Sequence, residues 1–150
     1  MIRKIDEHIS VAPQITPQEV RAIANAGFKE IINNRPDDEE GGQPSSAELE
    51  AAARAAGIGY VAIPVTHAGV SGNQIDAMAR ALEASPGPAL AFCRSGTRST
   101  HLWALARARL GDEPAELVAK AAHAGYDING IRPMLDTLAA EAAAKAAAKQ

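Results

Sequence analysis

Residues 89–100 read Ala-Leu-Ala-Phe-Cys-Arg-Ser-Gly-Thr-Arg-Ser-Thr and hold the only cysteine of this 150-residue chain. Four apolar residues precede Cys93, a glycine follows within a polar run, and a helical pattern then begins. This order predicts a buried strand, a tight loop and the N-terminus of a helix. Backbone N–H groups and the positive end of the helix dipole would then point at the loop, which favours a bound anion.

The same surroundings act on the thiol of Cys93. A helix N-terminus and cationic neighbours such as Arg94 and Arg98 lower a cysteine pKa from about 8.5 into the range of roughly 3.5–7.5. We therefore predict a nucleophile at the floor of a cationic cup, within reach of solvent. The alternative is a small apolar residue that ends a strand. The Arg-Ser-Gly-Thr-Arg run favours the reactive role.

The whole chain has the composition of one ordinary globular domain, with 47% hydrophobic and 22% charged residues. A net charge of −3 leaves no general basic surface, so neither nucleic acid nor an anionic membrane is expected as a partner. One cysteine and four scattered histidines do not have the spacing of metal ligands. We expect no metal and no cofactor.

The N-terminal residues show no apolar core of a signal peptide, and no run approaches the roughly 18 apolar residues of a membrane span. The sequence therefore predicts a cytoplasmic protein without a membrane partner, in a compartment where a reduced thiol persists. A periplasmic location stays open for a chain that has lost its leader.

Short β-like runs alternate with helical patterns along the chain. This alternation predicts an α/β fold with a mostly parallel sheet, right-handed crossovers and helices on both faces. Residues 2–5 and 9–11 would pair as an antiparallel hairpin at the sheet edge. The other expected strands are 28–33, 60–65 and 89–92, and the last three expected helices are 99–110, 113–124 and 131–150.

Ligands of such sheets bind beyond the carboxyl ends of the strands. The loops at 33–37 and 66–72 and the Cys93 loop would share that rim. At the C-terminal end of the chain, residues 139–150 are rich in alanine and lack large apolar side chains. We expect a domain at 1–138 followed by a solvated helical extension at 139–150, which either stays free or makes a homo-oligomer contact.

The run from Cys93 to Ser99, with residues 88–92 before it and Leu102-Trp103 after it, resembles the bacterial beta-lactamase-hydrolase-like, phosphatase-like domain family. Residues 31–39 and 63–65 are also similar to that family, and the resemblance covers about residues 5–138. It implies the architecture of the cysteine-dependent tyrosine and dual-specificity phosphatases. Some members of the family are described as sulfur transferases, so the resemblance leaves two activities open, phosphoester hydrolysis and sulfur transfer.

Loop length separates these two activities. Tyrosine phosphatases have five residues between the cysteine and the phosphate-binding arginine, whereas four residues separate Cys93 from Arg98. The shorter spacing is similar to the active loop of rhodanese-type sulfurtransferases, and a tighter ring of amides suits a terminal sulfur better than a phosphoryl group. The spacing favours a persulfide on Cys93, formed from thiosulfate or a persulfide donor and passed to a thiol acceptor. The alternative is a cysteine-dependent phosphatase that forms a cysteinyl-phosphate.

A phosphatase also needs a general acid, normally an Asp on a neighbouring rim loop. The segment between Thr66 and Gln74 contains no acidic residue, and Asp76 is expected on a helix surface. Asp37 and Asp38 remain substitutes on another loop. His67 is either an acid or a solvated side chain. Sulfur transfer needs no such acid, because its leaving group is already an anion.

The resemblance implies that Cys93 and Arg98 are the catalytic pair, with Arg98 directed at the anionic ligand. Arg94 either binds the same anion or faces solvent. Arg35 either binds a second anionic group or forms an ion pair within its own acidic loop, with Asp37, Asp38 or Glu39 as the partner.

The remaining loop residues either bind the anion or shape the loop. Ser95 and Thr97 supply hydroxyls to the anion or form the turn. Gly96 permits a backbone conformation that a side chain resists. Ser99 occupies the place of the hydroxyl that steadies the thiolate in phosphatases, or it caps the helix. A non-catalytic module that binds anions or senses oxidation is a third hypothesis for the loop as a whole.

Overall fold

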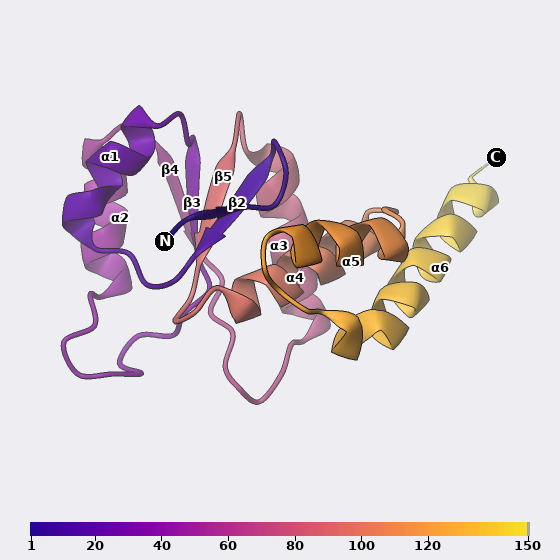
Figure 1. Cartoon of the computed structure of the whole chain (residues 1–150). Helices are drawn as coiled ribbons and strands as arrows, with labels where there is room; N and C mark the ends of the chain where they lie inside the picture. Colours follow the sequence, from indigo (N-terminus) through magenta and orange to yellow (C-terminus); the bar gives the residue numbers. More distant parts are fainter. Residues whose placement is uncertain (150) are drawn as a thin grey trace.

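The computed structural model describes residues 1–149, and a five-stranded sheet lies at its centre (Figure 1). The strands are β1 (Arg3–Lys4), β2 (Ile9–Ala12), β5 (Ala89–Phe92), β3 (Glu30–Asn33) and β4 (Gly59–Ala62), in that order across the sheet. Only β1 is antiparallel to its neighbour. The predicted α/β class and its mixed edge are confirmed.

Two strand predictions differ from the structure in detail. The hairpin of β1 and β2 forms, but only β1 is an edge strand, because β2 also pairs with β5. β4 ends at Ala62 instead of continuing to residue 65. Pro64 has no N–H and breaks the ladder. The flanking Ile63 and Val65 still donate their N–H groups to β3 and the residue after it, at 2.8 and 2.9 Å.

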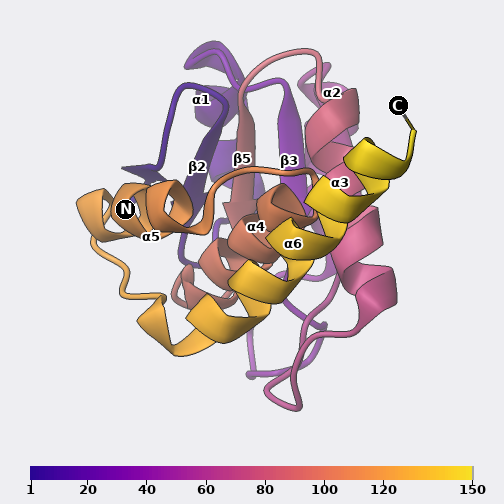
Figure 2. The same cartoon turned by 90° about the vertical axis from the view of Figure 1, so that its right-hand side faces the viewer.

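Helices cover both faces of the sheet (Figures 1 and 2). The apolar residues of β5 alternate between two cores. Leu90 and Phe92 pack with α1 and α2, whereas Ala89 and Ala91 face the larger core with α3 to α6. The bounds are η1 (Pro17–Glu19), α1 (Val20–Asn25), α2 (Ser46–Ala55), α3 (Gly72–Ala84), α4 (Thr97–Arg109), α5 (Pro114–His123), η2 (Asn129–Ile131) and α6 (Arg132–Ala148).

The helix α4, which follows the cysteine loop, is the central helix of the larger core. It packs against both α3 and α6, and Figure 2 shows α6 crossing in front of it. Leu102 and Trp103 are fully buried there. Each such side chain contributes roughly 1.5–3 kcal/mol of apolar burial. The first turn of α4 is therefore held rigidly at the carboxyl end of β5.

At two helix starts a carboxylate three residues along the chain accepts a backbone N–H from the capping residue. At α2 the hydroxyl of Ser45 accepts the N–H of Glu48 at 3.1 Å, and the Glu48 carboxylate accepts the N–H of Ser45. At Thr16 the Glu19 carboxylate accepts the N–H of Thr16 at 2.9 Å, and a short 3-10 turn begins there and continues directly into α1.

The C-terminal helix α6 runs without interruption through the predicted boundary at residue 138. Leu135 and Leu138 are buried, and exposed alanines and lysines follow. Figure 1 shows the last turns extending beyond the body of the protein. Gln150, the final residue of the predicted extension, lies outside the described residues. No helix in the described part of the chain has the length and apolar character needed to cross a membrane.

Candidate functional site

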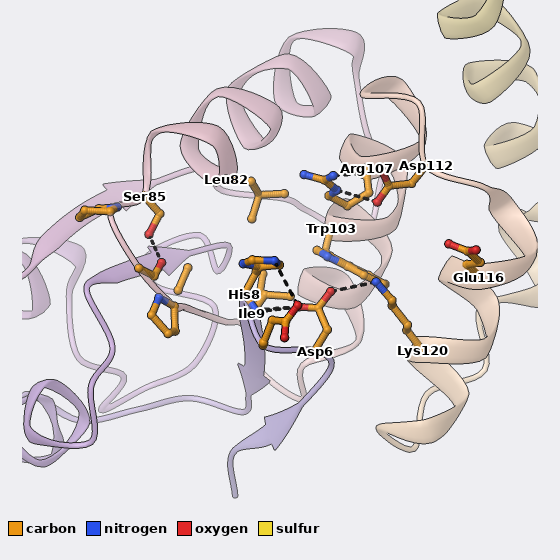
Figure 3. Close-up of a pocket in the computed structure, with 15 residues that line it drawn as sticks. Asp6, His8, Ile9, Leu82, Ser85, Trp103, Arg107, Asp112, Glu116 and Lys120 are labelled. Carbon is orange, nitrogen blue, oxygen red and sulfur yellow. Dashed lines mark hydrogen bonds and ion pairs between the residues drawn. The ribbon is translucent and has the colours of Figure 1, made fainter.

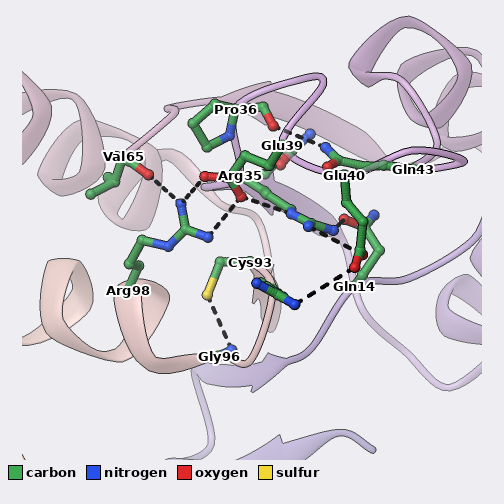
Figure 4. A network of polar contacts seen from close by, with 12 residues as sticks. Gln14, Arg35, Pro36, Glu39, Glu40, Gln43, Val65, Cys93, Gly96 and Arg98 are labelled. Carbon is green, nitrogen blue, oxygen red and sulfur yellow. Dashed lines mark hydrogen bonds and ion pairs between the residues drawn. The ribbon is translucent and has the colours of Figure 1, made fainter. Parts of the chain in front are cut away.

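The cysteine loop lies at the carboxyl end of β5, where the sequence predicts it. Cys93 follows the strand directly, and α4 begins at Thr97, two residues earlier than expected. The N–H of Gly96 donates to Cys93 Sγ at 3.1 Å (Figure 4). The sulfur thus lies at the N-terminus of a 13-residue helix, as expected for an anion-binding loop.

Gly96 is the N-cap of α4, and its φ is +93°. A side chain at this position would be strained in the left-handed region, and its Cβ would collide with the hydroxyl of Tyr126. That hydroxyl donates to the carbonyl of Ser95 at 3.1 Å, and burial raises the pKa of Tyr126. Tyr126 therefore braces the loop, a role that the sequence analysis did not identify.

Arg98 is held by two neighbouring loops. Its two terminal nitrogens each donate to a different oxygen of Glu39, both at 2.8 Å. The same Nη1 donates to the carbonyl of Val65 at 2.6 Å. The hydrogen bonds to Glu39 raise the pKa of Arg98, and the Cys93 sulfur adds to this effect. The predicted catalytic pair is therefore brought together.

The contact of Glu39 with Arg98 is a second feature of the site that sequence reasoning missed. Besides the bonds from Arg98, the Glu39 carboxylate accepts a hydrogen bond from Arg35 Nε at 2.8 Å. The hydrogen bond from Arg98, followed by that from Arg35, lowers the pKa of Glu39 from 4.5 to about 2. The sequence analysis considered Glu39 only as an ion-pair partner of Arg35. The spacing of four residues between the two was the available signal.

Arg35 is almost fully buried, with a side chain 2% exposed. Its ion pair with Glu39, one of the two alternatives, is present, and its Nη1 donates to Gln14 Oε1 at 3.0 Å. Its other terminal nitrogen, Nη2, lies 3.5 Å from a Glu40 oxygen and makes no hydrogen bond. The alternative partner Asp37 instead accepts the N–H of Ser46 at the start of α2.

The other loop side chains divide between solvent and the turn. Arg94 is 65% exposed and lies 3.6 Å from Glu40, which agrees with the alternative in which its side chain faces solvent. The hydroxyls of Ser95 and Thr97 bond to each other at 3.1 Å. Ser99 lies inside α4 instead of at its cap, and its buried hydroxyl has no hydrogen-bond partner.

The three predicted rim loops lie side by side: Asn34 donates its N–H to the Phe92 carbonyl, and its own carbonyl accepts the N–H of Val65, both at 2.9 Å. A cavity of about 450 Å³ opens between residues 65–70 and the cysteine loop; residues 33–37 do not line it, whereas Arg94, Ser95, Thr97 and Arg98 do. His67 also lines it, as does His101, whose pKa is lowered by burial. Asp76 pairs with Arg109 at 2.9 Å on the helix surface, as expected.

The expectation of an accessible thiol is wrong for this structure. Cys93 is 0% exposed and is not among the residues that line the cavity. Figure 4 places the sulfur between the Gly96 N–H on one side and the Arg98 and Glu39 side chains on the other. The ion pair of these two residues, joined to Arg35, thus lies beside the sulfur.

A larger cavity of about 690 Å³ lies at the opposite end of β5, where Ala89 lines it (Figure 3). Its charges are mainly paired with one another: Lys120 with Asp6 at 3.1 Å, and Arg107 with Asp112 at 2.8 Å. It holds no cysteine. Across residues 1–149, no three His, Cys, Asp or Glu side chains gather as metal ligands.

Fold and loop together define the class of the protein: an α/β protein of cysteine-phosphatase-like architecture. A crystal structure of a "putative phosphatase" from Neisseria meningitidis is similar, with a TM-score of 0.78 and 36% sequence identity, over 91% of this chain and 97% of that one. Tk-PTP in its active form has a TM-score of 0.72 at 18% identity, covering 93% and 96% of the two chains, and it shows the fold alone.

The family model for the phosphatase-like domain of beta-lactamase hydrolase-like protein matches residues 1–110, and the chain belongs to this family. A beta-lactamase hydrolase-like protein from Xylella fastidiosa is 36% identical over 125 residues. The match covers 83% of this chain but only 29% of that relative, so the chain spans less than a third of it. The resemblance inferred from the cysteine loop is confirmed.

Proposed function

We propose that the protein is a cysteine-dependent phosphatase acting on small phosphomonoesters, with Cys93 as its nucleophile. The observation that carries this proposal is the 3.1 Å hydrogen bond from the Gly96 N–H to Cys93 Sγ, at the N-terminus of α4 and beside Arg98. A sulfur held in this way is oriented toward an anion on the loop amides. The phosphatase-like relatives support the same reading.

In the proposed reaction, Cys93 Sγ attacks phosphorus while Arg98 and the loop amides bind the phosphoryl oxygens. The P–O bond to the alcohol breaks, the alcohol oxygen leaves with the electron pair, and a cysteinyl-phosphate remains. Water then attacks phosphorus, the S–P bond breaks, and inorganic phosphate departs. The sulfur recovers its electron pair and a proton passes to solvent.

The cavity beside the loop favours a particular leaving group. The described residues that line the cavity include no Asp or Glu. His67, on the rim loop, is the candidate proton donor among them. Without a carboxylic acid, an alcohol that departs as a stable anion reacts best. We therefore expect aryl phosphates with acidic phenols to be better substrates than alkyl phosphates.

Sulfur transfer is a second candidate, and two observations favour it: four residues separate Cys93 from Arg98, and no acidic residue lines the cavity. Here Sγ attacks the outer sulfur of thiosulfate, the S–S bond breaks, and sulfite leaves with the electron pair. A thiol acceptor then attacks the outer sulfur as its thiolate, the bond between that sulfur and Sγ breaks, and Cys93 leaves as the thiolate. The thiol acceptor and any homo-oligomer remain predictions.

One pair of measurements separates the candidates. Hydrolysis of an aryl phosphate, its inhibition by vanadate and its loss in Cys93→Ser support the phosphatase. A gain of one sulfur atom on Cys93 after incubation with thiosulfate, measured by mass spectrometry, supports sulfur transfer instead. Full turnover in Cys93→Ser would remove both proposals, because both require this sulfur.

A further inference from the structure

The carboxylate of Glu39 lies where an anionic substrate would meet Arg98. Both terminal nitrogens of Arg98 donate to it at 2.8 Å, one to each oxygen. This two-point contact is the one that a guanidinium makes with carboxylates and phosphates. The donors of Arg98 that the proposed function assigns to substrate are thus engaged by a side chain of the same protein.

Glu39 holds its place through a third charged contact. Arg35 Nε donates to its Oε1 at 2.8 Å, and Arg35 is itself buried and fixed by Gln14. Hydrogen bonds from Arg98 and then Arg35 lower the pKa of Glu39 to about 2, so the carboxylate is ionised near neutral pH. Arg98 therefore faces an ionised carboxylate that presents two oxygens to it, as a bound phosphate or other oxyanion would.

The nucleophile is buried beside this contact. Cys93 is 0% exposed, and the side chain of Arg98 is only 11% exposed. Figure 4 shows the Glu39 and Arg98 side chains on one side of the sulfur and the Gly96 N–H on the other. An oxyanion that binds both terminal nitrogens of Arg98, as in the proposed function, therefore has to replace Glu39 there.

Glu39 is carried by a segment that can release it. Residues 36–44 contain no helix or strand, and Asp38 and Gly42 have φ values of +62° and +80°. The ends of the segment are held independently of the Glu39 side chain: Asp37 accepts the Ser46 N–H at 2.8 Å, and Gln43 donates to the Pro36 carbonyl at 2.9 Å. A rotation of the Glu39 side chain away from Arg98 breaks its bonds to the arginines but neither of these two bonds.

We propose that Glu39 is a specificity-determining internal anion, which a substrate displaces from Arg98 only by presenting two oxygens of its own. This inference rests on the proposed function and narrows its substrate class. Phosphomonoesters, and sulfonate-type donors such as thiosulfate, carry the required oxyanion. A neutral molecule, or a persulfide that offers a single sulfur, does not replace both bonds.

If Glu39 merely positioned Arg98, its removal would leave Arg98 mobile and weaken the binding of an anion. Removal of an internal competitor strengthens that binding, because the substrate no longer exchanges with a bound carboxylate. The sign of the change in affinity therefore distinguishes the two roles.

The test uses Glu39→Gln, with Glu40→Gln as the matched control. Both variants remove one negative charge from the same loop, but Glu40 lies near Arg35 and Arg94, at 3.5 and 3.6 Å, and makes no contact with Arg98. Inorganic phosphate is titrated into each folded protein by calorimetry. The rate of Cys93 alkylation by iodoacetamide, a neutral reagent, is measured by mass spectrometry.

We expect Glu39→Gln to bind phosphate about tenfold more tightly than the unmodified protein and to be alkylated about tenfold faster, with changes below about threefold in Glu40→Gln. Glu39→Asp retains the charge with a shorter reach and serves as a second variant, with intermediate values. Phosphate affinity in Glu39→Gln that equals or falls below that of Glu40→Gln overturns the proposal.

The outcome is separable from that of the proposed function, because phosphate binding is measured without turnover. Tighter binding in Glu39→Gln, in a protein that hydrolyses no phosphoester, supports the internal anion and removes the phosphatase. Hydrolysis in a protein whose phosphate affinity is insensitive to Glu39 does the reverse.

Discussion

The hydroxyl of Tyr126 donates to the carbonyl of Ser95 at 3.1 Å, which joins the segment after α5 to the cysteine loop. The two residues lie 31 positions apart in the chain. The contact places a phenol directly over Gly96, the residue whose N–H faces the sulfur. The shape of the anion-binding loop thus depends on a part of the chain beyond the residues that carry its chemistry.

Replacement of Gly96 by alanine is expected to destabilise the protein and to disrupt the loop. The φ of +93° alone costs roughly 1–3 kcal/mol for a residue with a side chain, and the collision with Tyr126 adds to it. We expect loss of turnover together with a lower free energy of unfolding, measured by urea denaturation.

Gly111→Ala is the matched control for this variant. Gly111 has a φ of +105°, but a Cβ there meets no atom within 4 Å. It should therefore show the backbone strain without the collision. Equal destabilisation of the two variants would show that Tyr126 makes no difference, whereas partial rescue of Gly96→Ala by Tyr126→Phe would confirm the collision.

Local chemistry was readable from the sequence of this site. The apolar run ending at Cys93, the polar loop and the following helix predict the position of the sulfur, and residues 2–5 and 9–11 predict the hairpin of β1 and β2. In each case the partners lie within a few residues of one another. Neighbours in the chain determine such structures largely by themselves.

Contacts across the sheet rim were not readable in the same way. The bond between Glu39 and Arg98 joins residues 59 positions apart, and that between Tyr126 and Ser95 joins two separate elements. Neither pair has a spacing that a helix or strand would impose. The complete burial of Cys93 likewise became visible only in the folded structure.

Ser99→Ala separates a functional hydroxyl from a structural one. The Ser99 hydroxyl is buried without a hydrogen-bond partner, and an unsatisfied buried group of this kind costs roughly 1–3 kcal/mol. Its removal should leave the free energy of unfolding unchanged or raise it by up to about 1 kcal/mol. Turnover should nevertheless fall if the hydroxyl steadies the Cys93 sulfur during the reaction.

The measurements for this variant are kcat on an aryl phosphate and the urea midpoint. Thr100→Val is the comparison, because the Thr100 hydroxyl donates to the Gly96 carbonyl at 2.7 Å and has a clear structural role. Thr100→Val should therefore unfold at a lower urea concentration than the unmodified protein. Unchanged kcat in Ser99→Ala would remove the hydroxyl from the mechanism.

The ion pair of Glu39 should make stability depend on pH in the acid range. Its pKa is lowered from 4.5 to about 2 by Arg98 and Arg35, so its contribution is complete above pH 4.5 and disappears as the pH falls toward 2. At about 1.4 kcal/mol per pKa unit, the full effect is of the order of 3 kcal/mol.

The contribution is isolated by comparing the unmodified protein with Glu39→Gln between pH 2 and pH 5. Other carboxyl groups titrate equally in both proteins, so the difference in their free energies of unfolding reports Glu39. We expect this difference to shrink as the pH falls. A difference that stays constant across the range would show that the carboxylate gains nothing from its two arginines on folding.

Removal of residues 139–150 tests the predicted boundary of the domain. Leu138 is the last buried large side chain of α6, and the alanines and lysines that follow are mostly exposed. We therefore expect a chain that ends at Leu138 to keep its free energy of unfolding within about 1 kcal/mol, because little apolar surface is lost. Leu135→Ala in the full chain should instead lose about 2–5 kcal/mol, because it opens a cavity against α4.

Urea denaturation measures the stability of both variants, and gel filtration shows whether the shortened chain changes its oligomeric state. A loss of several kcal/mol in the shortened chain would assign residues 139–149 to the folded domain, and conversion of an oligomer to monomers would assign them to a subunit contact.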